Sequence, residues 1–197
     1  MEAHETDHVH DMGDVSVLYV GGESTTPAGL EGGERIDVTA ARAPGEARER
    51  LALPQEDTIL LFFGALRQDK GIGVLLRALR EYTGPPFTQL IAGPPSGVEV
   101  AEIEAAARHS PVRIVSRLEY IDEQEAYYRA ADAVVMPYTP KFGKENMSMI
   151  FQEACGALRP LIVSDFGVHG RLTEEWDLGL TFRCYSAERL ADALSAF

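Results

Sequence analysis

Two glutamates, Glu145 and Glu153, lie eight residues apart just before an apolar run of the sequence. We expect a helix to begin near Met147 or Ser148, with Asn146 or Ser148 as its cap. The first amides of that helix would then be free to bind phosphate or sugar oxygens. Glu153 would lie about a turn and a half into the helix, where its carboxylate could accept from both hydroxyls of a vicinal diol.

Two cations lie in a second stretch, GALRQDKG at residues 64–71, between a predicted strand and a predicted helix. Together with free helix amides, Arg67 and Lys70 would form a clamp for a diphosphate, because fixed cationic and amide donors stabilise negative charge on phosphate oxygens. The alternative is a loop whose basic residues are simply solvated.

The elements that would position these residues alternate regularly between apolar runs and amphipathic stretches. A continuous apolar run is typical of a buried parallel strand. The pattern predicts helices at 44–53, 71–82, 98–108, 122–130, 147–157 and 186–196, and strands at 59–64, 87–92, 112–116, 133–137, 160–164 and 179–183. Such alternation predicts an α/β, Rossmann-like parallel sheet with helices on both faces.

Ligands of such sheets bind beyond the carboxyl ends of the strands. Gly64, Gly93, Pro137 and Asp165 all fall at those ends. We therefore expect the candidate residues to converge on one edge of the sheet.

The spacing of the two glutamates, followed by Ala154 and PLIVSD at 160–165, resembles the signature of the retaining GT-B glycosyltransferases. Three further segments in matching order carry the same resemblance: ILLFFGALRQDKGIGVLLRAL at 59–79, AGPP at 92–95 and AADAVVMPY at 130–138. The resemblance covers about residues 46–197. It implies the C-terminal, donor-binding half of a GT-B fold, of the group 1 or family 4 type.

The resemblance also implies a role for individual residues. Glu145 would face the sugar hydroxyls and act in catalysis with Arg67 and Lys70, and Glu153 would bind the ribose. The other residues implied to bind substrate are Gly64, Tyr120, Ile121, Asn146, Met147 and Ser148. Tyr120 and Ile121 would line the nucleobase pocket, or would serve packing alone. The resemblance implies no metal and no cofactor.

Three positions depart from the family pattern. Ala65 stands where relatives carry an arginine after the glycine, so Arg67 would have to take over the phosphate contact. Asn146, Met147 and Ser148 replace a glycine-aromatic-glycine triplet. His169 lies near a position where relatives have a second glycine, and it would either donate to the sugar or have a structural role in a loop.

Composition limits the class of protein. The 197 residues carry a net charge of −13, and only three of the 18 basic residues are lysines, which argues against nucleic acid as a partner. No apolar run reaches the length of a membrane span, and residues 1–15 do not resemble a signal peptide, so we expect a cytoplasmic protein. Cys155 and Cys184 are predicted to be free thiols.

The first 43 residues differ from the rest. His4, His8 and His10 lie among acidic residues, which suggests either a metal site or a solvated terminus. Short strands are expected at 15–20 and 35–40, with a glycine-rich loop between them. We therefore divide the chain into an N-terminal extension, 1–43, and a nucleotide-sugar-binding domain, 44–197.

The function that the resemblance implies is transfer of a hexose from a nucleotide diphosphate sugar to an unknown acceptor with retention. A separate N-terminal acceptor domain would be a partner, since residues 1–43 are too few to build one. The alternative is a non-catalytic module, derived from such a domain, that binds a nucleotide or a partner chain.

Overall fold

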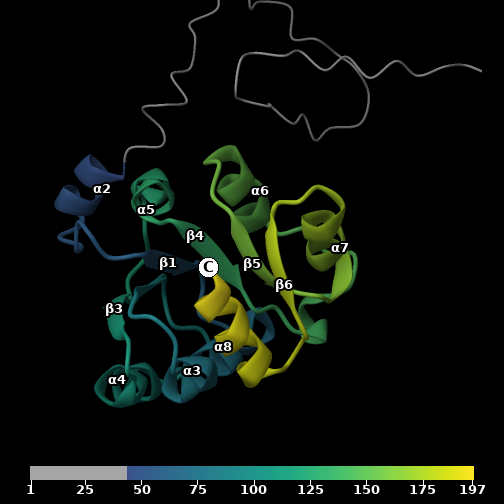
Figure 1. The fold of residues 1–197 in the computed structure, drawn as a ribbon, viewed down its shortest axis with the longest axis horizontal. Helices are drawn as coiled ribbons and strands as arrows, with labels where there is room; N and C mark the ends of the chain where they lie inside the picture. Colours follow the sequence, from purple (N-terminus) through teal and green to yellow (C-terminus); the bar gives the residue numbers. More distant parts are fainter. Residues whose placement is uncertain (1–43) are drawn as a thin grey trace, which may run out of the picture. The chain divides into compact units, whose positions relative to one another are not determined.

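The computed structural model describes residues 44–197 (Figure 1). Within them lies one six-stranded sheet with the order β3-β2-β1-β4-β5-β6, and all neighbouring strands are parallel. The strands are β1 (Ile59–Phe63), β2 (Thr88–Ala92), β3 (Arg113–Arg117), β4 (Ala133–Met136), β5 (Leu161–Ser164) and β6 (Gly179–Phe182). The predicted α/β, Rossmann-like sheet is confirmed.

Helices cover both faces of this sheet. They are α2 (Gly45–Arg50), α3 (Ile72–Glu81), α4 (Val100–His109), α5 (Gln124–Ala130), α6 (Met149–Gly156), α7 (Gly167–Glu175) and α8 (Ala187–Ala196), with short 3-10 helices η1 (Gln68–Lys70) and η2 (Pro140–Phe142). Helices α3, α4 and α8 lie on one face, whereas α2, α5 and α6 lie on the other (Figure 1).

Strand β1 shows why the apolar runs are continuous. Its side chains alternate between two cores, with Ile59, Leu61 and Phe63 in one and Leu60 and Phe62 in the other. Because successive side chains point to opposite faces, a strand covered on both faces must be apolar at every position.

Helix α7 was not predicted from the sequence. The pattern indicated two consecutive strands with a loop between them, but neighbouring parallel strands need a crossover, and here it is helical. Gly167 and Gly170 lower the helix propensity of this stretch. Burial of Leu172 against the core outweighs that local preference. His169, which the sequence placed in a loop, therefore lies on a helix and is buried.

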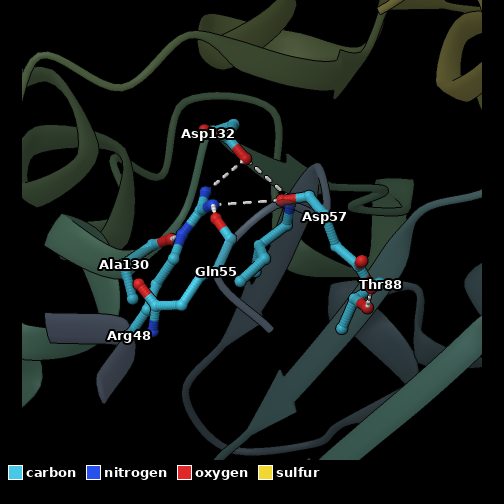
Figure 2. A network of polar contacts seen from close by, with 7 residues as sticks. Arg48, Gln55, Asp57, Thr88, Ala130 and Asp132 are labelled. Atoms are coloured by element: carbon cyan, nitrogen blue, oxygen red, sulfur yellow. Dashed lines mark hydrogen bonds and ion pairs between the residues drawn. The ribbon is translucent and has the colours of Figure 1, made fainter. Parts of the chain in front are cut away.

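The amino-terminal edge of the sheet contains a buried ionic network (Figure 2). Arg48 of α2 donates from Nε to the carbonyl of Ala130 at 3.0 Å and from Nη1 to the carbonyls of Gln55 and Asp57 at 2.7 and 3.1 Å. Its Nη2 lies 2.7 Å from Oδ2 of Asp132. This side chain therefore links α2 to the carboxyl end of α5 and to the segment before β1.

Two further expectations concern the chain as a whole. Cys155 and Cys184 are free, as predicted, and both are half-buried. Among residues 44–197, no helix is long and apolar enough to cross a membrane. The three N-terminal histidines, His4, His8 and His10, and the strands expected at 15–20 and 35–40 lie outside the described residues, so the division at residue 43 stays a prediction.

Candidate functional site

The loop after β1 is held against the loop after β2. Leu66 donates its amide to the carbonyl of Pro94 at 2.9 Å and accepts from Ser96 at 3.1 Å. Gly64 begins this loop with φ of +89°, and a Cβ there would lie 2.8 Å from Nζ of Lys70 and 2.7 Å from Cδ1 of Ile150. Glycine thus leaves room for a lysine ammonium and for the first turn of α6 at the carboxyl edge of β1.

Lys70 ends η1 and points into this space. Its Nζ lies 6.0 Å from the centroid of the Tyr138 ring, and burial, with a smaller contribution from the charge of Arg67, lowers the pKa of Lys70 below its usual range. Within the described part of the chain, no carboxylate lies within ion-pair distance of Nζ. The ammonium is therefore half-buried and available to an anion.

Arg67, the other predicted cation, already has a partner. Its Nε and Nη2 donate to Oδ1 and Oδ2 of Asp69 at 2.9 and 2.6 Å. This bidentate pair raises the pKa of Arg67 and lowers that of Asp69. Asp69 is in turn fixed through its carbonyl, which accepts from N and Oγ1 of Thr139 at 2.9 and 3.1 Å. The guanidinium is thus partly neutralised before any ligand binds.

The amino end of α6 faces the same edge. Ser148 occupies the N-cap, but its hydroxyl lies 3.1 Å from that of Tyr138 and makes no cap bond. The amide of Phe151 donates to the carbonyl of Ser148 at 3.1 Å, whereas the amides of Met149 and Ile150 keep their hydrogen-bonding capacity. The amide of Ser148 itself donates to Nε2 of His169 at 3.0 Å. Burial lowers the pKa of His169 to about 4, so the imidazole is neutral at pH 7 and supports the helix start. This geometry favours the structural role over the sugar donor.

Glu153 lies on the second turn of α6 and is half-buried. Its Oε2 accepts a hydrogen bond of 2.6 Å from the hydroxyl of Tyr128 on α5. The charge of Glu153 also raises the pKa of Lys70, which opposes the larger effect of burial and indicates that the two groups share one region. The predicted ribose acceptor and the predicted diphosphate cation therefore lie at the same edge of the sheet.

Other predicted residues lie apart from this cluster or at its rim. Glu145, Asn146 and Met147 are exposed in the segment before α6, and Nδ2 of Asn146 donates to the carbonyl of Phe142 at 2.7 Å. Tyr120 is 73% exposed, whereas Ile121 is buried in the core beside α5. Ile121 thus packs in the core and Tyr120 is open to solvent, whereas their predicted place in a nucleobase pocket stays a prediction.

Comparison with known proteins decides the family. A family model described as "Glycosyl transferases group 1" matches residues 45–197. The chain belongs to this family. It is similar to D-inositol 3-phosphate glycosyltransferase from Corynebacterium glutamicum (strain R), with 28% identity over 163 residues that cover 78% of this chain and 38% of that protein. The chain thus spans well under half the length of the relative that it matches.

Solved structures support the same assignment. Sucrose-phosphate synthase from Thermosynechococcus elongatus superposes with a TM-score of 0.64 and 26% identity, over 77% of this chain and 38% of that one. Anabaena HepE in complex with UDP and glucose gives a TM-score of 0.63 at 18% identity, over 78% and 42% of the two chains, which shows the fold alone. The described residues form a GT-B glycosyltransferase C-terminal domain, as the resemblance implied.

Three residues that contact the candidate site residues were not predicted from the sequence: Asp69, Tyr128 and Tyr138. Asp69 carried a local signal, since it follows Arg67 by two residues and can reach its guanidinium. Tyr138 directly follows a predicted strand, which also places it at the carboxyl edge. Tyr128 carried no such signal, because nothing in the sequence places α5 beside α6.

Proposed function

We propose that this glycosyltransferase domain binds a nucleotide diphosphate sugar and is the donor-binding half of a retaining transferase that moves a hexose. One observation carries the proposal: Lys70 presents a half-buried ammonium, without a carboxylate partner in the described residues, between Gly64 and the first turn of α6. A buried charge without a counter-ion is costly, so a site built this way favours an anionic ligand. That HepE was solved with UDP and glucose supports a nucleotide-sugar donor.

The proposed chemistry follows from where charge develops. As the bond between the anomeric carbon and the diphosphate breaks, negative charge accumulates on the leaving diphosphate. Lys70 and the first-turn amides of α6 would stabilise that charge without having to reorganise. Glu153 would hold the ribose, and Glu145, exposed before α6, would reach toward the sugar hydroxyls. In a retaining transfer, the acceptor oxygen then bonds to the anomeric carbon on the face that the diphosphate leaves, and the proton of the acceptor hydroxyl passes to the departing phosphate oxygen.

Calorimetry on the 197-residue chain tests the donor site. UDP, ADP and GDP would each be titrated beside the corresponding nucleoside. We expect one diphosphate to bind at least tenfold more tightly than its nucleoside, since charge-assisted hydrogen bonds to phosphate exceed about 1.4 kcal/mol. Equal affinity for the two, or no diphosphate binding at all, would contradict the proposal.

A non-catalytic nucleotide-binding module is the second candidate. It is favoured by the pairing of Arg67 with Asp69, which leaves Lys70 as the one unpaired cation among the predicted clamp residues. Release of UDP from UDP-glucose, in the presence of a panel of sugar and polyol acceptors, separates the two candidates. Nucleotide binding without any acceptor-dependent release of UDP would favour the module. The acceptor, a separate N-terminal acceptor domain and a cytoplasmic location stay predictions from the sequence.

A further inference from the structure

The contact between Tyr128 and Glu153 joins two helices that lie on the same face of the sheet. The tyrosine hydroxyl on α5 donates to Oε2 of Glu153 on α6 at 2.6 Å. Tyr128 is 2% exposed, and its ring packs against Phe63 of β1 with a centroid separation of 5.2 Å. The donor is thus held by the core, whereas its acceptor lies at the edge of the candidate site.

The hydroxyl of Tyr128 acts as a hydrogen-bond donor to Glu153. Burial, followed by its hydrogen bond to Glu153, raises the pKa of Tyr128 above its usual range, so the group keeps its proton and remains a donor. Among the described residues, Oε2 is the oxygen of Glu153 that is engaged, and Oε1 accepts no hydrogen bond. One carboxylate oxygen is anchored and the other is free.

We propose that Tyr128 is a positioning residue for the donor nucleotide, which fixes the carboxylate of Glu153 so that Oε1 faces a ribose hydroxyl. This inference rests on the proposed function. A carboxylate on a mobile side chain turns back to water when a hydroxyl is missing, so the loss of that hydroxyl costs little. A fixed and partly desolvated carboxylate cannot turn, so the missing hydroxyl leaves an unmet charged acceptor. Tyr128 thereby increases discrimination between ribose and deoxyribose.

The adjacent tyrosine supplies a matched control. Tyr127 is also buried, at 6% exposure, and also packs against Phe63, at 5.8 Å between centroids. Within residues 44–197 its hydroxyl makes no hydrogen bond. Tyr127→Phe and Tyr128→Phe therefore each remove one hydroxyl from the same helix and the same aromatic cluster, but only the second frees Glu153.

The experiment compares binding of UDP, ADP and GDP with binding of their 2′-deoxy forms by calorimetry on the full chain. For the diphosphate that binds best, we expect the wild-type protein and Tyr127→Phe to prefer the ribonucleotide by about tenfold. Tyr128→Phe should reduce that preference to about threefold or less. Thermal unfolding of the three proteins shows that each is folded under the conditions of the titration.

A second variant tests whether Tyr128 acts through Glu153. In a Glu153→Gln background, Tyr128→Phe should leave the remaining preference unchanged, since coupled residues are not additive. A Tyr128→Phe protein that keeps the tenfold preference would overturn the inference while leaving the donor site intact. A wild-type protein that binds none of the diphosphates would overturn both the inference and the proposed function.

Discussion

The two edges of the sheet differ in whether a cation that is shielded from solvent has hydrogen-bond partners. At the amino edge, Nε and Nη1 of Arg48 donate to carbonyls, and Nη2 donates to Oδ2 of Asp132 (Figure 2). Oδ2 of Asp132 also accepts from the amide of Ile59 at 2.7 Å. At the carboxyl edge, Lys70 is half-buried without a carboxylate partner in the described chain. A paired buried cation is costly to remove from the fold, whereas an unpaired, half-buried one can bind an anionic ligand.

Arg67 is intermediate between these two cases. It lies at the carboxyl edge with Lys70. Like Arg48, however, it has a carboxylate partner, which is Asp69. The side chain of Arg67 is far more exposed than that of Arg48, at 43% against 5%, so the pair of Arg67 with Asp69 contributes little to stability. The following predictions change one edge at a time.

The largest effect is expected at the amino edge. Arg48→Met removes the cation but keeps an apolar stem of similar length, and it leaves Asp132 and three carbonyls without their donor. Removing one partner of a buried pair costs about 3–5 kcal/mol. Because Asp132 is 34% exposed and keeps the Ile59 amide as a donor, we expect urea unfolding to show a loss near the lower end, about 3 kcal/mol. Affinity for a nucleoside diphosphate should not change in conditions where the variant is folded.

Arg50→Met is the control, because Arg50 lies on the same helix and pairs with Glu123 through side chains that are 57% and 65% exposed. An exposed pair of this kind contributes less than about 1 kcal/mol. If Arg48→Met costs no more than Arg50→Met, the buried network is not a stabilising feature of the amino edge.

The contribution of His169 to stability, through its hydrogen bond with the amide of Ser148 at the start of α6, should depend on pH. Burial lowers the pKa of His169 from 6.5 to about 4, so between those values the unfolded chain binds more protons than the folded one. Stability should therefore fall as pH drops from about 6.5 toward 4, by about 2–3 kcal/mol from this residue. His169→Gln keeps an acceptor for the amide of Ser148 without titrating, so its stability should fall less over the same range. Unfolding curves that change in parallel for both proteins would contradict this assignment.

The parallel sheet and the residues at its carboxyl edge could be predicted from the sequence, whereas the network around Arg48 could not. The continuous apolar runs predicted the parallel strands, and residues that directly follow a strand must lie at its carboxyl edge. Gly64 was placed correctly for that reason, and Lys70 lies near it at the end of the same loop. Helix α7 was missed because two glycines obscured a segment whose burial, and not its propensity, makes it helical.

The pairings of side chains could not be predicted in the same way. Tyr128 and Glu153 are 25 residues apart, and their contact depends on which helices become neighbours on the sheet. Asp69 is close to Arg67 in sequence, but whether its carboxylate turns toward the guanidinium depends on the turn at η1 and on the anchoring of Asp69 by Thr139. Sequence periodicity specifies elements and edges, whereas partners depend on packing.

The contrast between Lys70 and Arg67 can be tested directly by affinity. Lys70→Ala should weaken binding of the preferred nucleoside diphosphate by about 2 kcal/mol, since it removes the unpaired cation. Arg67→Ala should cost less, because Asp69 already holds that guanidinium, and the double variant should lose at least about 2 kcal/mol. Nucleoside affinity should hardly change, and Lys141→Ala, at an exposed lysine of η2, serves as the control. Equal losses for Lys70→Ala and Arg67→Ala would show that the Asp69 pair does not weaken the contribution of Arg67.

The smallest effect should be a gain in affinity from releasing Arg67. A diphosphate at this edge competes with Asp69 for the guanidinium and is repelled by its carboxylate. Asp69→Asn removes that charge, keeps the side-chain shape and leaves the main-chain bonds to Thr139 in place. We therefore expect the diphosphate to bind about three- to fivefold more tightly, or roughly 1 kcal/mol, with a stronger dependence on salt. Asp192→Asn, which frees Arg189 on α8, makes the same change in net charge and should leave affinity unaltered. A weaker affinity in Asp69→Asn would mean that the carboxylate orients Arg67 toward the phosphate, and the pair would then support ligand binding and not oppose it.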